Sequence, residues 1–106
     1  MLEIKLTPKA HQDIENIYTY ISKDGETIAS KQVRLIYKAL ENLKDFPRLG
    51  KDFSKYFNLN YNYRVLSIEK TYLAFYRIEQ DQLLIIRILR TSQDYISLLE
   101  LEQVSF

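Results

Sequence analysis

The sequence predicts an α+β domain in which a helical hairpin packs on a mostly antiparallel sheet. Three strand-like runs rich in β-branched and aromatic residues follow one another at 63–68, 72–78 and 83–89. The polar breaks between them are only three and four residues long, and such breaks join antiparallel strands but not parallel ones. The first half of the chain instead carries apolar residues at helical spacing.

The amino-terminal segment predicts a strand followed by a helix. Residues 2–6 alternate apolar and polar side chains, which is typical of a strand with one buried face. Thr7 and Pro8 then suit a helix start, because threonine caps helices and proline is tolerated at the first helical position. Apolar residues at helical spacing predict a helix over about 8–22, and Gly25 marks the break after it.

The segment 26–46 predicts a longer helix, because its apolar residues are spaced four, three, four and three positions apart. These residues are Ala29, Val33, Ile36, Leu40 and Leu43. The break between the two helices is so short that they must form an antiparallel hairpin. Neither apolar stripe is stable in water, so we expect the hairpin to cover the sheet.

A loop is predicted over 46–60, since Pro47 ends the second helix. Basic and aromatic residues alternate in it, and such a mixture binds phosphates and stacks on bases. The other interpretation is a solvated loop whose aromatic rings pack under the sheet. The basic residues are Arg48, Lys51 and Lys55.

The predicted order is β-α-α-β-β-β with a short C-terminal helix, in a single domain that spans residues 1–106. The closing helix follows residues 91–94, which resemble a capping box. The first strand needs a partner, and the long crossover allows it to pair with the last strand in either direction. The sequence leaves both directions open.

Composition limits the chemistry available to this chain. With no cysteine and one histidine, His11, we expect neither a metal site nor a Ser-His-Asp triad, and no cofactor is predicted. A net charge of +1 argues against a general nucleic-acid coat but allows a local basic patch. No signal-peptide pattern and no run of about 18 apolar residues is present, so we expect a cytoplasmic protein without membrane contact.

Arginines recur within or at the ends of the strand-like runs. Because alternate strand residues share a face, Arg64 lies with Leu66 and Ile68. By the same rule, the predicted neighbours of Arg90 are Leu84, Ile86 and Ile88. An arginine at the rim of an apolar face holds a phosphate or carboxylate through two hydrogen bonds. The alternative is an arginine whose stem lies on the sheet while its head stays in water.

These features together resemble the RelE/ParE superfamily of toxins from bacterial type II toxin–antitoxin modules. The resemblance covers nearly the whole chain: the helix TPKAHQDIENIYTYI, the turn FPRLG, and YRVLSIEKTYLAFYRI leading into LLIIRILRTSQDYISLLE. It implies a growth-arresting toxin, a cognate antitoxin, and operator DNA bound only through that antitoxin. The long hairpin, the YLAFYRI and ILRTSQDY segments and the low net charge look nearer to the ParE-like branch, which binds DNA gyrase.

Three functions remain open on this basis. The favoured one is ParE-like inhibition of DNA gyrase; the second is RelE-like, ribosome-dependent cleavage of mRNA; the third is a module that binds only its antitoxin and operator DNA. A RelE-like enzyme would be a metal-independent RNA endonuclease, with Arg64 and Arg90 stabilising charge and no residue assigned as general base. Tyr95 would then donate a proton or stack on a base, and its alternative is a core position in the closing helix. The residues predicted to bind the target are Arg48, Lys51, Lys55, Arg77 and Arg87.

Overall fold

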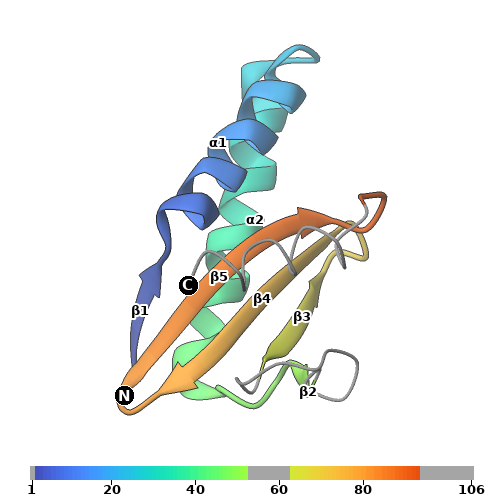
Figure 1. Cartoon of the computed structure of the whole chain (residues 1–106). Coiled ribbons are helices and arrows are strands. Elements are labelled where there is room, and N and C mark those ends of the chain that lie inside the picture. Colours follow the sequence, from blue (N-terminus) through green and yellow to red (C-terminus); the bar gives the residue numbers. More distant parts are fainter. Residues whose placement is uncertain (1, 53–62, 94–106) are drawn as a thin grey trace.

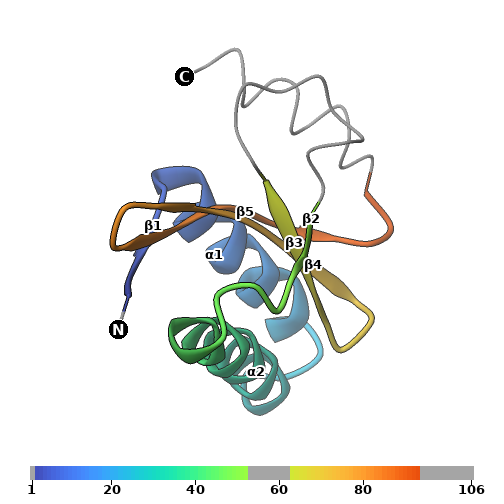
Figure 2. The ribbon, with the colours of Figure 1, turned by 90° about the horizontal axis from the view of Figure 1, so that it is seen from below.

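The computed structural model describes residues 2–52 and 63–93. In this part of the chain the elements are β1 (Glu3–Leu6), α1 (Pro8–Ser22), α2 (Glu26–Asp45), β2 (Lys51–Asp52), β3 (Arg64–Ile68), β4 (Tyr72–Glu79) and β5 (Gln82–Arg90). The helical hairpin packs against the sheet, and Figure 2 shows α2 entirely on one side of it. The predicted α+β class and helical hairpin are therefore confirmed.

Five strands form one sheet in the order β1-β5-β4-β3-β2 (Figure 1). The meander β3-β4-β5 is antiparallel, as its short polar breaks predict. The first strand pairs with β5 in parallel, from Glu3 opposite Gln82 to Leu6 opposite Ile85. This direction, which the sequence leaves open, makes the hairpin and the rest of the meander one long crossover between two parallel neighbours.

Local signals set the helix boundaries. The side chain of Thr7 accepts a hydrogen bond from the amide of Ala10 at 3.1 Å, and Pro8 opens α1, as predicted. Gly25 lies between the helices with a φ of 140°, a conformation that side chains rarely permit. Among the described residues, no helix has both the length and the apolar composition needed to cross a membrane.

A short strand lies inside the segment for which the sequence predicts a loop. Lys51 and Asp52 pair with Val65 and Arg64, which makes β2 the outermost strand beside β3. The prediction of an uninterrupted loop over 46–60 is therefore wrong at these two residues. A strand of only two residues is too short to show an alternating pattern in the sequence. The strand forms because the preceding turn is held against the sheet.

The core lies between the hairpin and one face of the sheet. Tyr76, the largest fully buried side chain, belongs to it. The helices contribute Ala10, Ile14, Ile17, Ile36, Leu40 and Leu43, and the sheet contributes Ile68, Tyr72, Ala74, Tyr76, Leu83, Ile85 and Ile88. Both predicted apolar stripes are thus core surfaces.

An irregularity in β5 changes the predicted neighbours of Arg90. Opposite β4, Phe75 pairs with Arg87 and Tyr76 pairs with Ile85, which leaves Ile86 as an extra residue. Ile85 and Ile88 consequently both face the helices. Arg90 shares a face with Ile88, as predicted, but the predicted grouping with Leu84 and Ile86 is wrong because the bulge interrupts strict alternation.

Candidate functional site

The turn after α2 is held against the sheet by the hydroxyl of Tyr76. This oxygen accepts a hydrogen bond from the amide of Gly50 at 2.9 Å and donates one to the carbonyl of Pro47 at 2.8 Å. Burial raises the pKa of Tyr76, an effect that the hydrogen bond from Gly50 and the charge of Arg64 partly offset. The hydroxyl therefore keeps its proton at neutral pH and can make both bonds.

Gly50 packs so closely against the sheet that no side chain fits there. A Cβ atom would lie 2.6 Å from the Tyr76 hydroxyl oxygen and 2.8 Å from the carbonyl oxygen of Val65. Both distances are shorter than non-bonded contacts allow, and one of the crowding atoms is rigid backbone. The glycine of the FPRLG segment is therefore required by close approach to β3 and β4.

Arg64 at the start of β3 binds the same turn. Its Nη1 atom donates to the carbonyl oxygen of Gly50 at 2.7 Å and to that of Arg48 at 3.4 Å. Arg64 and Arg48 then line a pocket of about 330 Å³ together with Asp52 and Ile78. The structure thus brings together one predicted catalytic residue and one predicted target-binding residue.

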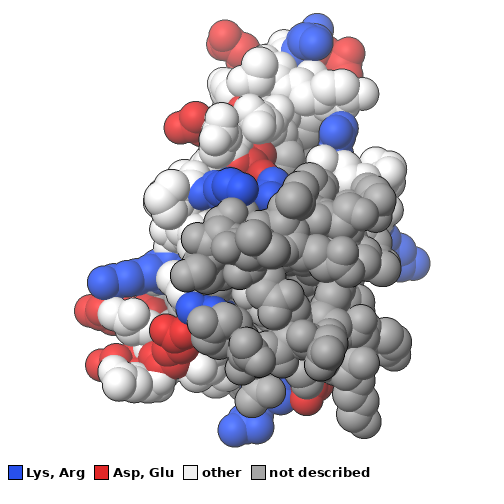
Figure 3. Space-filling view, viewed as in Figure 1, with Lys and Arg blue, Asp and Glu red and all other residues white. Residues whose placement is uncertain are grey.

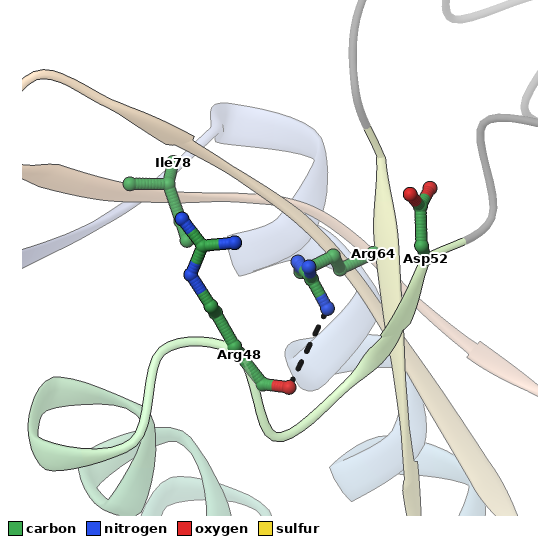
Figure 4. Close-up of a pocket in the computed structure, with 4 residues that line it drawn as sticks. All are labelled: Arg48, Asp52, Arg64 and Ile78. Atoms are coloured by element: carbon green, nitrogen blue, oxygen red, sulfur yellow. Dashed lines mark hydrogen bonds between the residues drawn. The ribbon is translucent and has the colours of Figure 1, made fainter.

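The two guanidinium groups share this pocket, as Figure 4 shows. Each points into the space between Arg48 and Arg64, whereas the carboxylate of Asp52 points away from it. Ile78 forms an apolar wall beside Arg48. Two like charges converging on one space make an anion favourable there, and guanidinium groups bind carboxylate or phosphate oxygens through paired hydrogen bonds.

Arg87 occupies a different environment, because a carboxylate binds it within the fold. Its Nε and Nη2 atoms donate to Oδ2 and Oδ1 of Asp13 at 2.7 and 2.8 Å. The side chains of Arg87 and Asp13 are only 12% and 10% exposed. Arg87 stays a predicted target-binding residue, although Asp13 already matches its charge within the fold.

The Asp13 carboxylate also completes the edge of the sheet. Strand β1 ends opposite Ile85, and no strand of the described residues continues the pairing along the outer edge of β5 from Ile86 onward. Thr7 continues the pairing by donating from its amide to Ile85 at 3.0 Å and from its hydroxyl to Ile86 at 2.7 Å. Oδ2 of Asp13 then accepts from the amide of Ile88 at 2.9 Å. The start of α1 therefore closes this edge.

Arg77 and Arg90 lie outside the Arg48–Arg64 pocket. Arg77 forms an ion pair with Glu79, with 2.6 Å between Nε and Oε1. The guanidinium carbon of Arg90 lies 4.9 Å from the ring centre of Tyr20, and the ammonium of Lys23 lies 5.8 Å from the same ring. Arg90 also borders a smaller pocket of about 70 Å³ that Tyr20 helps to line.

Arg64 and Arg90 do not meet at one reaction centre in this structure. Arg64 pairs with Tyr76, and Arg90 pairs with Tyr72, four residues away along β4. That offset corresponds to about 13 Å along the strands. The predicted catalytic roles of both arginines remain predictions, and each would have to act in its own pocket.

The remaining predicted site residues have separate positions. Lys51 is exposed on β2. Tyr95 and Lys55 lie outside the described residues, as does the predicted closing helix. Within residues 2–52 and 63–93, no group of three or more His, Cys, Asp or Glu side chains is placed to hold a metal ion.

Sequence reasoning missed three residues that organise these sites: Asp13, Gly50 and Tyr76. Asp13 carries a usable signal, since it is a carboxylate three positions after Ala10, within the apolar stripe of α1. Gly50 belongs to the FPRLG segment, but its contact with β4 depends on tertiary structure. Tyr76 looks like any aromatic strand residue, and only the approach of the turn gives its hydroxyl two partners.

Solved structures place this architecture in the class of toxin–antitoxin proteins. A chain described as "Chromosomal ParDE TA system from P. aeruginosa" matches with a TM-score of 0.72 and 26% sequence identity. The match covers 85% of this chain and 96% of that chain. A comparison with curated protein sequences gave no match.

The family itself follows from a sequence model described as the ParE toxin of the type II toxin–antitoxin system, parDE, which matches residues 4–95. This chain belongs to the ParE toxin family. The expected resemblance to RelE/ParE toxins, nearer the ParE-like branch, is thereby confirmed, and the chain is the toxin component of a type II toxin–antitoxin module.

Proposed function

We propose that this toxin arrests growth by inhibiting DNA gyrase and that its exposed basic residues contribute to the contact. Membership of the ParE family over residues 4–95 is the observation that carries the proposal, and it also implies a cognate antitoxin as partner. Arg48 and Lys51 are exposed beside the turn and remain the predicted target contacts on the described surface.

The chemistry around the sheet arginines supports recognition of a protein rather than cleavage of RNA. Metal-independent RNA cleavage requires groups that move protons and groups that stabilise a phosphorane at one centre. Arg64 and Arg90 lie in separate pockets, and Arg87 is neutralised by Asp13. The described lining of the Arg48–Arg64 pocket adds only Asp52 and Ile78. Arginines and aromatic residues are, in contrast, frequent hot spots of protein interfaces.

The surface charge supports the same preference. On the described part of the face in Figure 3, Lys and Arg are interspersed with Asp and Glu. The net charge of the chain is +1. A protein that docks on ribosomal RNA gains affinity from many phosphate contacts, which requires a broad basic surface. A protein target needs only local complementarity.

Induction of the toxin in growing cells tests the mechanism. We expect DNA-damage signalling and stalled replication before protein synthesis falls, and purified toxin should inhibit supercoiling by gyrase in vitro. The proposal is wrong if translated messages are cut within codons in the first minutes of induction and those cuts disappear in Arg64→Ala.

Alanine variants test which exposed cations serve the target contact. Arg48→Ala should weaken inhibition of supercoiling by about 10-fold, because Arg48 is an exposed predicted target contact and interface arginines commonly contribute more than 1 kcal/mol. Arg34→Ala is the matched control, since Arg34 is an exposed arginine of α2 that does not line the Arg48–Arg64 pocket. Equal inhibition by the two variants would remove Arg48 from the contact surface.

A further inference from the structure

The Arg48–Arg64 pocket has the composition of a site for one carboxylate side chain. Two guanidinium groups converge on it, and Ile78 supplies an apolar wall (Figure 4). Its volume of about 330 Å³ lies at the small end of the range for ligand pockets. An acidic side chain has the matching parts, because its methylene stem can pack on Ile78 while its oxygens accept from both arginines.

A nucleic-acid phosphate fits this surface less well. Phosphate backbones are bound by rows of cations, and each cation adds to a long-range attraction. Here the pocket offers one pair of guanidinium groups and no row of cations among its described residues, and acidic residues are mixed with basic ones on the described part of the face in Figure 3. A single acidic side chain delivered by a protein needs only the local pair of guanidinium groups.

We propose that this pocket receives the carboxylate of an acidic side chain from the cognate antitoxin. The antitoxin is the partner that family membership provides, and charge complementarity assigns it this contact. The inference rests on the proposed function in one respect: occupation of the pocket covers Arg48, a predicted target contact, so antitoxin and target compete for it.

The fold prepares the pocket before the partner arrives. Tyr76 and Arg64 together bind the carbonyl or amide groups of Pro47, Arg48 and Gly50, so the backbone that carries the Arg48 side chain is fixed. Such preorganisation lowers the entropic cost of association. Tyr76 and Arg64 are in this sense positioning residues for Arg48, and Arg64 is also a ligand of the carboxylate.

Dissociation of the antitoxin from the intact complex tests the proposal. The complex is purified from cells that co-express the toxin with the antitoxin from the neighbouring reading frame, and release of labelled antitoxin is followed against excess unlabelled antitoxin. We expect Arg48→Gln to accelerate release by about 10-fold or more, because loss of one partner of a desolvated charge pair acts mainly on the dissociation rate. Arg48→Lys should give an intermediate rate, since it keeps the charge but loses the paired donors.

Lys51→Gln is the matched control, because it removes one positive charge three residues from Arg48 without altering the described lining of the pocket. It should change the release rate by less than about 2-fold, as rim charges mainly affect association. Equal rates for Arg48→Gln and Lys51→Gln would overturn the proposal.

Substitution on the antitoxin identifies the group that enters the pocket. Each acidic residue of the antitoxin is changed to its amide, and one of them should accelerate release in wild-type toxin but have no further effect in Arg48→Gln. Additive effects at every acidic position would overturn the carboxylate assignment. A release rate that rises with inorganic phosphate in wild type but not in Arg48→Gln would indicate a site that accepts any oxyanion and would overturn selectivity for a carboxylate. None of these measurements depends on gyrase, so failure of the gyrase mechanism and failure of this inference are distinguishable.

Discussion

Arg87 and Arg64 both project from the sheet, but the fold treats their charges differently. Arg87 makes two hydrogen bonds to the carboxylate of Asp13, and both side chains are almost entirely buried. Arg64 donates instead to the uncharged carbonyl groups of Gly50 and Arg48, in a pocket that it shares with a second guanidinium. One arginine is neutralised within the fold, and the other is held in place with its charge uncompensated by the groups it binds.

The difference shows how position determines the use of a single residue type. A guanidinium that leaves water at the junction of α1 and β5 requires a counter-charge, because an unpaired buried charge is strongly destabilising. A guanidinium at the start of β3 that is only half-buried remains partly hydrated, so carbonyl groups are sufficient to orient it. Arg87 therefore stabilises the junction of α1 and β5, whereas Arg64 is the residue that we propose presents its charge to a partner.

The largest expected effect comes from removing the counter-charge of Arg87. Asp13→Ala should lower the free energy of unfolding by about 3–5 kcal/mol, because it leaves a largely buried guanidinium unpaired and removes the acceptor of the Ile88 amide. Chemical denaturation of the purified toxin, followed by circular dichroism, measures this change.

Two variants sharpen that prediction. Glu15→Ala, which removes an exposed carboxylate from the same helix, should change the free energy of unfolding by no more than about 0.5 kcal/mol. The double variant Asp13→Ala with Arg87→Met should recover part of the loss, since an apolar pair can replace a buried ion pair. A loss below about 1 kcal/mol for Asp13→Ala would show that Arg87 does not need a carboxylate partner. Arg87 would then not differ from Arg64 in this respect.

A smaller loss is expected where Arg64 meets the turn. Gly50→Ala should lower the free energy of unfolding by about 1–3 kcal/mol, because the added methyl group displaces the turn from Tyr76 and from the Val65 carbonyl. Thermal unfolding compares it with Leu49→Ala, which truncates a neighbouring side chain that is 57% exposed. Equal melting temperatures for the two variants would contradict the close packing of this turn.

The smallest effect is a pH dependence that arises from Tyr76. Burial raises the pKa of Tyr76 above its ordinary value of 10.0, with smaller opposing effects from Gly50 and Arg64. The folded state therefore holds the phenolic proton more tightly than the unfolded state. The contribution of the protonated Tyr76 hydroxyl to the free energy of unfolding is fully present below about pH 10. It is lost as the pH rises through the higher pKa of the folded state.

Denaturation at a series of pH values, with tyrosinate absorbance recorded in parallel, measures this loss. Tyr76→Phe lowers stability at every pH by removing two hydrogen bonds, but it should also flatten the decline above pH 10. Tyr72→Phe is the matched comparison. Burial also raises the pKa of Tyr72, and the charge of Arg90 only partly offsets this effect. The same slope in wild type and Tyr76→Phe would show that Tyr76 does not carry the pH dependence.

Most of the secondary structure could be predicted because its signals are local. The helix start at Thr7 and the break at Gly25 depend on capping and on backbone freedom, which single residues supply. The antiparallel meander follows from breaks too short for any other connection. The family followed from the order of these elements together with quoted segments such as FPRLG.

The site was less predictable, because each of its contacts joins residues distant in the chain. Arg48 and Arg64 were predicted in different roles, and only the turn held by Tyr76 brings them into one pocket. The bulge at Ile86 has no signature in the alternation of β5, yet it changes which residues share a face with Arg90.

The sequence by itself determined the two helices, the three-stranded meander and the abundance of arginine, since periodicity and composition are properties of short segments. Tertiary structure alone decided that β1 runs parallel to β5, that Lys51 and Asp52 pair with β3, and which arginine receives a carboxylate. The reason is physical: the free energy of a buried charge depends on which group lies within about 3 Å of it. For Arg87 that group is Asp13, 74 residues away in the chain.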